Sequence, residues 1–486
     1  SSLRKDHKII EYPIKGPPGR PLCSGNVGYN YRFSHLICMF LKDVTENEPT
    51  ECENTEDLIA KFKEINVNGV GTDVQIGSMD VKALYPSLEI DHAIEIVCKE
   101  FVESRIKIDG INTKELTLYI ALTKTQDEID AMGIADKCPT RRCNRGPRPN
   151  ITGNGTKEKD EDRYEPWVFP DNSALTPSEI RTLFSIALKI ALTRILKNHI
   201  YTFDGKLYRQ TSGGAIGLEL TGEIAKIYMA WWDKEFLRNL QNMGISPPFY
   251  KRYVDDINTA VNYPGDGCII KDGQLAKDET KAENDRNRNR DEVTMDLLKE
   301  IGNTIHRSIQ LETDYPSKYS DNKLPILDLR TWIAEIDGKR IMMYEYYRKD
   351  VSTKATIHAR SAIPSRQKKT VLTQELLRIM KNCCPQIDEE QRNGHINNFM
   401  MRMQYSGYDK EFRFDVFNSA NKAYQIAQQN DNSGEKPMHR PKEWDRSRRK
   451  KEKLEKRKSL YKNNGTIYTR RKIEKIVRKG NQEIRI

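Results

Sequence analysis

FYKRYVDDINTAV, residues 249–261, places two adjacent aspartates between two apolar runs. The pattern predicts a strand, a turn between Val254 and Ile257, and a second strand. Aspartate is disfavoured in strands, and neighbouring strand residues point to opposite faces of a sheet. A turn can aim both neighbours toward one site, so Asp255 and Asp256 are expected at a hairpin tip. There they lie either in open solvent or beside a partner that makes use of their charge.

A second segment, SMDVKALYPSL, residues 78–88, puts Asp80 at the end of an apolar strand that turns into a helix. Carboxylates gathered without a cation repel one another, and some stay protonated. With two Mg²⁺ ions roughly 3.5–4 Å apart, they form a clamp for in-line phosphoryl transfer. Mg²⁺ suits this role because it takes one or two carboxylates and fills its octahedron with water and phosphate oxygens. Taken alone, an Asp-Asp pair is also typical of a solvated acidic turn.

The net charge of +11 is concentrated near the C-terminus. Residues 440–479 contain 18 Lys and Arg against 5 Asp and Glu, which leaves the rest of the chain close to neutral. This basic tail has two interpretations. It is a solvated segment, or it is a nucleic-acid or nuclear-import patch whose Lys and Arg meet phosphates.

The remaining composition bears on location. The 9 cysteines follow no disulfide framework, which indicates a reducing, intracellular compartment, and the basic tail leads us to expect the nucleus. No apolar run reaches about 18 residues, so no membrane span is expected. The first residue is a serine rather than a methionine, and we therefore expect a fragment of a longer protein.

Local signals predict elements around the two motifs. Thr176, Pro177 and Glu179 form the cap, first position and capping box of a long helix. Residues 324–349 predict a hairpin that turns at Asp337-Gly338.

Three motifs together resemble reverse transcriptases, and they occur in that family's order. They are MDVKALYPSL at residues 79–88, QTSGGAIGLELTGEIAKIYM at 210–229 and YVDD at 253–256. Upstream, KDHKIIEYPIKGPPGRPLCS at 5–24 is similar to the fingers motif. Three later segments resemble the distal palm and thumb of Penelope-like retroelements, relatives of telomerase reverse transcriptase: LPILDLRTWI at 324–333, YEYYRKDVSTKATIHARSAIPSRQKK at 344–369 and QYSGYDKEFRFDV at 404–416. The resemblance covers roughly residues 1–430.

The resemblance implies a role for each matching residue. Asp80, Asp255 and Asp256 would be the ligands of two Mg²⁺ ions, with Mn²⁺ as an alternative, and Val81 would lend its backbone carbonyl to one of them. Tyr85 would lie under the incoming sugar and exclude a 2′-hydroxyl, which selects dNTPs. A core aromatic residue is the competing interpretation of Tyr85.

Further residues would contact the nucleotide. Arg20 would hold the triphosphate, with Lys8 or Lys15 as helpers, unless it is a surface arginine beside a proline turn. Gln210 and the glycines through Gly217 would let the backbone approach the nascent base pair, unless they only form the entry to a helix.

The glycine loop departs from the family's pattern. The family usually has Gly-Ser-Pro followed by leucine and a small polar residue, whereas here Gly217 precedes Leu218 and Glu219. A carboxylate there either weakens nucleotide binding or faces away into a polar contact. The segment ALYPS also resembles family B DNA polymerases, but their Asp-Thr-Asp motif does not occur here.

We therefore expect an α+β right-hand polymerase with fingers, a palm built on an antiparallel sheet, a helical thumb and a basic C-terminal tail. Fingers and palm would occupy residues 1–345, with insertions near 132–165 and 271–300. The thumb would occupy residues 346–430 and the tail 431–486.

The expected function is RNA-directed DNA polymerisation by a retroelement enzyme. It would extend a DNA 3′-OH with dNTPs on an RNA template by two-metal phosphoryl transfer. The competing hypothesis is a catalytically silent, polymerase-derived protein that binds RNA or DNA. A pure binder, however, has no reason to gather carboxylates against phosphate repulsion.

Overall fold

The structure is a computed structural model, and it describes residues 2–4, 19–21, 31–45, 48–104, 113–141, 167–171, 174–203, 205–349 and 355–433. The chain divides into two compact units, Ser1–Lys354 with Asn382–His395, and Ala355–Lys381 with Ile396–Ile486. Helices and antiparallel sheets make up the described residues, which confirms the predicted α+β class in this coarse form. The assignment of fingers, palm and thumb stays a prediction.

A four-stranded antiparallel sheet forms the centre of the first unit. Its strand order is β12-β3-β9-β8, so β3 and β9 are the inner strands. Since β3 and β9 come from the two aspartate-bearing segments, the sheet brings residues far apart in sequence next to each other. The bounds are Val74–Val81 for β3, Phe249–Tyr253 for β8, Asp256–Asn262 for β9 and Leu311–Asp314 for β12.

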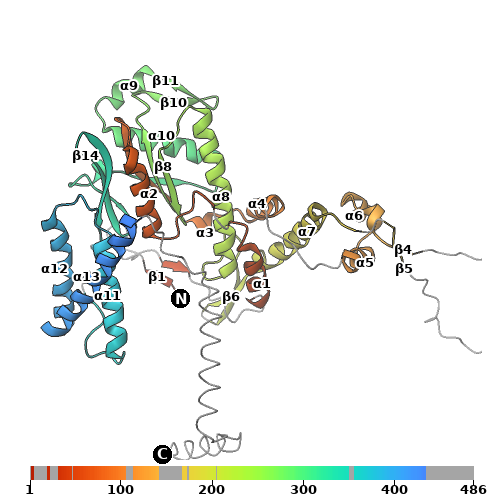
Figure 1. Cartoon of the computed structure of the whole chain (residues 1–486). Helices are drawn as coiled ribbons and strands as arrows, with labels where there is room; N and C mark the ends of the chain where they lie inside the picture. Colours follow the sequence, from red (N-terminus) through yellow and green to blue (C-terminus); the bar gives the residue numbers. More distant parts are fainter. Residues whose placement is uncertain are drawn as a thin grey trace, which may run out of the picture. The chain divides into compact units, whose positions relative to one another are not determined.

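One face of this sheet packs on helices. Alternate residues of a strand point to opposite faces, and Met79 and Val81 of β3 join a large apolar cluster with helical residues. The helices that contribute are α4 (Ile90–Glu103), α8 (Glu219–Asn242) and α10 (Arg290–Ile305). Figure 1 shows α8 and α10 beside the strands.

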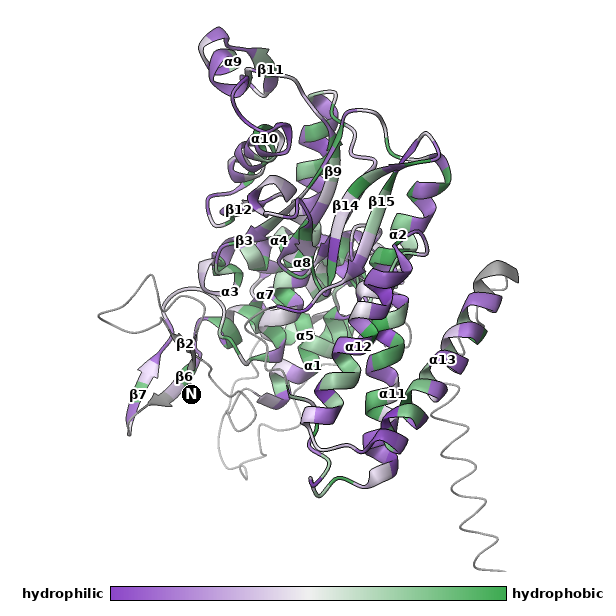
Figure 2. Ribbon diagram, turned by 90° about the vertical axis from the view of Figure 1, so that its left-hand side faces the viewer, coloured by the Kyte–Doolittle hydropathy of each residue, from purple (hydrophilic) through white to green (hydrophobic). Residues whose placement is uncertain are grey.

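The opposite face is covered at one end only. Val74 and Ile76 join a second apolar cluster, whereas Ser78 and Asp80 share their face of β3 but lie beyond that cluster. The second cluster is built with α2 and a three-stranded sheet, whose hydrophobic strands lie next to that helix in Figure 2. The bounds are Thr55–Asn68 for α2, Leu324–Ile326 for β13, Leu329–Ile336 for β14 and Lys339–Tyr346 for β15. One end of the central sheet is thus left open.

Two local predictions are confirmed. Helix α7 (Pro177–Leu196) begins with Thr176 as its cap and a reciprocal capping box with Glu179. The β14–β15 hairpin turns at Asp337 and Gly338, both with positive φ, as a tight two-residue turn requires.

The charged stretch at 271–300, predicted as an insertion, contains ordered elements. Strands β10 (Cys268–Lys271) and β11 (Gln274–Lys277) form a hairpin, and α9 (Glu279–Asp285) and α10 follow. Helix α10 lies directly on β3, because a Cβ on Gly77 would be only 2.1 Å from the Met295 sulfur. This helix is therefore part of the apolar core of the unit.

The stretch at 132–165 is described only in part. Residues 135–137 form a short 3₁₀ turn, and β4 (Thr140–Arg141) pairs with β5 (Trp167–Val168). Residues 142–166 lie outside the described residues.

Three helices occupy most of residues 355–433. In the second unit, α11 packs against α13, and an ion pair between Lys369 and Asp415 joins them. Their bounds are Ser365–Lys381 for α11, Glu389–Tyr405 for α12 and Lys410–Ser433 for α13. The basic tail at 440–479 lies outside the described residues. Among the described helices, none is long and apolar enough to cross a membrane.

Candidate active site

The predicted strand, turn and strand at 249–261 are confirmed as the β8–β9 hairpin. Val254 occupies the left-handed region with φ 57°, which is rare for a β-branched residue. Asp255 lies in the turn and Asp256 begins β9. The backbone N–H of Val81 donates to the Asp255 carbonyl at 3.3 Å, so the turn is also tied to the end of β3.

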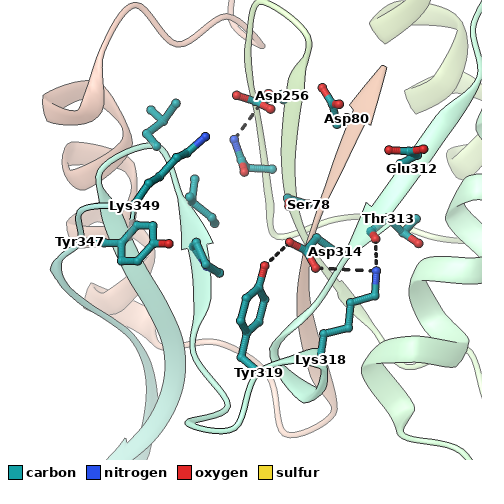
Figure 3. Close-up of a pocket in the computed structure, with 14 residues that line it drawn as sticks. Ser78, Asp80, Asp256, Glu312, Thr313, Asp314, Lys318, Tyr319, Tyr347 and Lys349 are labelled. Atoms are coloured by element: carbon teal, nitrogen blue, oxygen red, sulfur yellow. Dashed lines mark hydrogen bonds and ion pairs between the residues drawn. The ribbon is translucent and has the colours of Figure 1, made fainter. Parts of the chain in front are cut away.

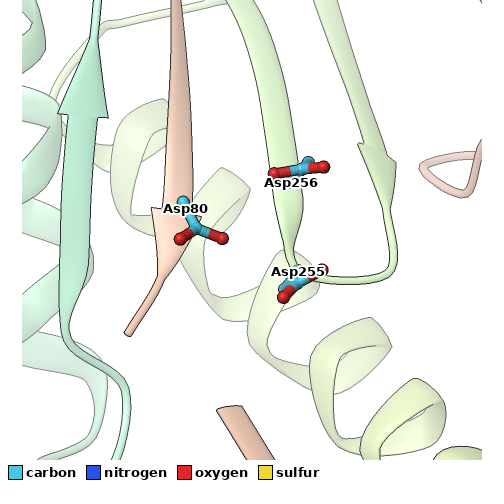
Figure 4. Close-up of side chains that lie close together, drawn as sticks. All are labelled: Asp80, Asp255 and Asp256. Atoms are coloured by element: carbon cyan, nitrogen blue, oxygen red, sulfur yellow. The ribbon is translucent and has the colours of Figure 1, made fainter. Parts of the chain in front are cut away.

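The hairpin and β3 bring three carboxylates together. Asp80 and Asp256 are direct cross-strand partners, and side chains of such partners share a face. Carboxylate oxygens of Asp80, Asp255 and Asp256 all lie within 4.8 Å of one another. Figure 4 shows the three carboxylates at the open end of the two strands. The donor set fits Mg²⁺, which prefers oxygen ligands and takes one or two carboxylates.

A fourth carboxylate, that of Glu312 on β12, was not predicted from the sequence. It is the cross-strand partner of Asp80 on the side away from Asp256, so three acidic residues lie in register across three strands. Like charges directly opposite each other are destabilising. Lys82 offsets part of this repulsion, because its ammonium group lies 3.2 Å from the Glu312 carboxylate. At four residues, β12 is too short to give a clear alternation in the sequence.

The crowding changes the acidity of Asp256. Burial, followed by the charges of Asp255 and Asp80, raises the pKa of Asp256 to about 6, while Lys349 opposes the shift. A carboxyl group so placed holds its proton more tightly than usual, and a nearby positive charge favours its ionised form. The arrangement therefore favours a bound cation. Lys349, which is exposed, is a second residue that the sequence analysis did not single out.

Two carboxylates of the cluster, Asp80 and Asp256, border a pocket of about 640 Å³. Asp80 and Asp256 lie on one wall, and Lys318, Tyr347 and Lys349 lie on others (Figure 3). Tyr319 and Lys318 both contact Asp314. The pocket thus combines carboxylates with cationic and phenolic groups that suit a phosphate-bearing ligand.

Tyr85 and the glycine loop pack against each other. The Gly214 N–H donates to the Tyr85 carbonyl at 2.7 Å, and a Cβ on Gly213 would lie 2.3 Å from the Pro86 carbonyl oxygen. Burial and the nearby charge of Asp255 raise the pKa of the Tyr85 phenol, which is half-buried. Tyr85 therefore lies close enough to Asp255 for the charge of that carboxylate to act on its phenol.

Gln210 and Gly217 belong to the same loop. The Gln210 amide donates to the carbonyls of Ser212 and Gly213, both at 3.0 Å, and Gly217 has φ 105°. Gln210 thus braces the loop from within. Gly217 ends it in a conformation that residues with side chains rarely adopt.

The question about Leu218 and Glu219 has a structural answer. Leu218 is buried, and the Glu219 carboxylate lies 2.8 Å from Nδ1 of His35 on α1 (Tyr31–Leu41). Glu219 therefore makes the polar contact that was one of the two expectations.

The expected triphosphate contacts are not described. Arg20 belongs to the short strand β2 (Gly19–Pro21), but its side chain lies outside the described residues. Lys8 and Lys15 also lie outside them. Their roles stay predictions.

Comparisons with known proteins give weak structural likenesses only. No protein-family model matches the chain. No curated protein matches it either. Among solved structures, a telomerase from Candida albicans in complex with the TWJ fragment of telomeric RNA is similar at 11% identity and TM-score 0.43, covering 84% of this chain. An apo telomerase from Candida tropicalis is similar at 11% identity and TM-score 0.33, covering 81% of this chain.

This chain spans 59% of the Candida albicans chain and 55% of the Candida tropicalis chain. At such low identities and TM-scores, these likenesses support no inference about function. The closer resemblance to Penelope-like retroelements stays a prediction from the motifs.

Proposed function

We propose that the chain is an RNA-directed DNA polymerase of a retroelement that extends a DNA 3′-OH with dNTPs on an RNA template. The observation that carries the proposal is the meeting of Asp80, Asp255 and Asp256 within 4.8 Å at the open end of a sheet. These residues come from two motifs that resemble those of reverse transcriptases and that lie far apart in the sequence.

Asp80, Asp255 and Asp256 would hold two Mg²⁺ ions, or Mn²⁺ in their place, with the Val81 carbonyl as a further ligand. When bound, the ions would lower the pKa of the primer 3′-hydroxyl and balance charge on the leaving pyrophosphate. The pKa of Asp256, raised to about 6, leaves this carboxylate ionised near neutral pH. Asp256 is then available as a ligand.

The other site residues would position the nucleotide. The half-buried Tyr85 ring would lie beneath the incoming sugar and exclude a 2′-hydroxyl. The glycine loop, held to Tyr85 by the Gly214 N–H, would present backbone rather than side chains to the new base pair. Arg20 would bind the triphosphate. RNA template and DNA primer are thus the proposed partners, and the nucleus is the proposed location.

The test is primer extension by the purified chain on poly(rA)/oligo(dT) with dTTP and Mg²⁺ or Mn²⁺. We expect incorporation that EDTA abolishes. Binding of this duplex without any incorporation under either metal would favour the alternative, a catalytically silent nucleic-acid-binding protein.

A further inference from the structure

A buried ion pair lies directly behind the aspartate turn. Arg252 is the penultimate residue of β8, and Asp233 lies on α8. Both side chains are essentially inaccessible, at 0% exposure for each residue, and Nε of Arg252 lies 2.8 Å from the Asp233 carboxylate. A buried ion pair contributes little net stability compared with apolar residues of the same size. Its presence therefore calls for another explanation.

The surroundings hold the Asp233 carboxylate in one orientation. The Tyr250 hydroxyl donates to one of its oxygens at 2.6 Å. The Thr50 hydroxyl and Arg252 both donate to the other, at 2.9 and 2.8 Å. The Arg252 backbone is fixed as well, since its N–H donates to the Thr50 carbonyl at 2.8 Å. The guanidinium group is thus oriented from several sides.

The free end of this guanidinium reaches the turn. Nη1 of Arg252 donates to the carbonyl oxygen of Val254 at 2.9 Å. Val254 is the residue with φ 57°, and the next two residues are Asp255 and Asp256. The left-handed conformation is unfavourable for a β-branched side chain, so an outside contact must hold it. Nη2 of Arg252 has no hydrogen-bond partner among the described residues. Within that part of the chain, the Arg252 side chain therefore makes two hydrogen bonds, one to Asp233 and one to the Val254 carbonyl.

The geometry points to Arg252 as a positioning residue for the carboxylates, with Asp233 as the group that orients it. The Val254 carbonyl, held by Arg252, fixes the peptide that leads into Asp255, and the turn then directs Asp255 and Asp256 toward Asp80. This inference rests on the proposed function, because it assumes that the three carboxylates bind metal ions. A purely structural role would change stability alone.

The test compares Arg252→Lys with Arg252→Lys/Val254→Gly in the full chain. Lysine keeps the charge beside Asp233 but lacks the fork that also reaches the Val254 carbonyl. Mn²⁺ affinity is measured from the EPR signal of free Mn²⁺, and Tm is measured in parallel. We expect Arg252→Lys to bind Mn²⁺ roughly tenfold more weakly, the scale set by the cost of a left-handed residue with a side chain. Glycine adopts that conformation freely, so Val254→Gly should restore most of the affinity without restoring Tm.

Arg288→Lys is the matched control, because Arg288 is also held by carboxylates, but those of Asp285, Glu292 and Asp296, none of which belongs to the β8–β9 hairpin. It should leave Mn²⁺ affinity unchanged. If Arg252→Lys does not fold, Tyr250→Phe removes one hydrogen bond to Asp233 and keeps the pair. It should weaken Mn²⁺ binding less than Arg252→Lys does, again with recovery by Val254→Gly.

A folded Arg252→Lys or Tyr250→Phe variant with the affinity of the wild type would overturn the inference. So would a loss of affinity that Val254→Gly does not recover. The two hypotheses fail differently. Suppose that the wild type binds Mn²⁺ and that Val254→Gly restores the affinity lost in Arg252→Lys, but that the wild type extends no primer. This result would refute polymerase activity and leave the positioning role intact.

Discussion

The β8–β9 hairpin carries charged groups in two contrasting settings. Behind the turn, Arg252 is wholly buried and its charge is matched by Asp233, whose oxygens also accept bonds from Tyr250 and Thr50. At the tip, Asp255 and Asp256 meet a third carboxylate, Asp80, and two of the three, Asp80 and Asp256, line a pocket. The charges of the buried pair are balanced within the protein, whereas the cluster at the tip is acidic and gains from an added cation.

The buried pair and the carboxylate cluster should differ in what a substitution changes, the stability of the fold or the binding of metal ions. Removing one partner of a buried pair leaves an uncompensated charge, which is costly to the fold. Removing one member of a repelling cluster removes a ligand without a cost to the fold. A substitution in the buried pair should therefore lower stability, whereas a substitution in the carboxylate cluster should lower metal binding and activity.

The largest expected effect separates Asp255→Asn from Asp233→Asn. Asp255→Asn should lower dNTP incorporation by more than about a hundredfold, since loss of outer-shell support alone costs metal sites about 10–100-fold. It should leave the free energy of unfolding nearly unchanged. Asp233→Asn should instead cost about 3–5 kcal/mol of stability. Primer extension and urea unfolding measure the two effects.

Asp272→Asn controls for loss of a negative charge. Asp272 lies in the β10–β11 turn with φ 51°, a conformation that asparagine tolerates, and it should behave as wild type in both assays. Substantial dNTP incorporation by folded Asp255→Asn would contradict the assignment of Asp255 as a metal ligand.

The second expected effect concerns how an acidic site retains nucleic acid. The carboxylates repel phosphates, and the 18 basic residues at 440–479 hold the chain's net positive charge. If a third of them bind phosphates, truncation before Arg440 should reduce the slope of log affinity against log salt by roughly 4–5. Binding to primer–template is measured across a salt series. Equal slopes for both proteins would rule out this role and leave nuclear import as the better account of the tail.

The third expected effect concerns Tyr85, which is proposed to select dNTPs over rNTPs beside the carboxylate cluster. Tyr85→Val should raise the incorporation of rNTPs relative to dNTPs by roughly 10–200-fold, the range for a small group in a fitted pocket. The measurement is a competition between rNTP and dNTP on one primer, with Tyr85→Phe as the matched control that keeps the ring. An unchanged ratio in an active Tyr85→Val protein would show that another residue excludes the 2′-hydroxyl.

The smallest expected effect is a gain in the stability of Asp256→Asn over wild type that depends on pH. The folded-state pKa of Asp256, about 6, lies above its ordinary value of 3.8, so the folded state binds more protons between these values. The stability this group contributes is present below pH 3.8 and is lost as the pH rises through about 6. In EDTA, the stability of Asp256→Asn relative to wild type should therefore grow by roughly 1–2 kcal/mol between pH 5 and pH 8.

Urea unfolding from pH 5 to pH 8 checks this prediction. The difference between the two proteins should grow as the pH rises, and Mg²⁺ should stabilise the wild type only. A difference that is constant with pH would contradict the raised pKa of Asp256.

The sequence predicted those elements whose signals are local. The capping box of Thr176 and Glu179, the Asp337-Gly338 turn and the hairpin around Asp255 each depend on a few adjacent residues. The meeting of Asp80 with the hairpin was predicted from the resemblance in motif order. It could not be derived from spacing, because it depends on the pairing of β3 with β9.

The missed features depend on contacts between distant segments. Glu312 enters the site through the register of a four-residue strand, and no periodicity marks so short a stretch. Arg252 reads in the sequence as one basic residue in a strand. Only the packing of α8 behind the turn shows that it is buried against Asp233.

The central claim is that the three carboxylates gather in order to hold cations, and Mn²⁺ stoichiometry tests it most directly. EPR of free Mn²⁺ is recorded during titration of the full chain, of Asp255→Asn and of the Asp272→Asn control at pH 8. The account predicts two tight Mn²⁺ ions for wild type and control, and fewer for Asp255→Asn. Equal Mn²⁺ binding by wild type and Asp255→Asn would contradict it.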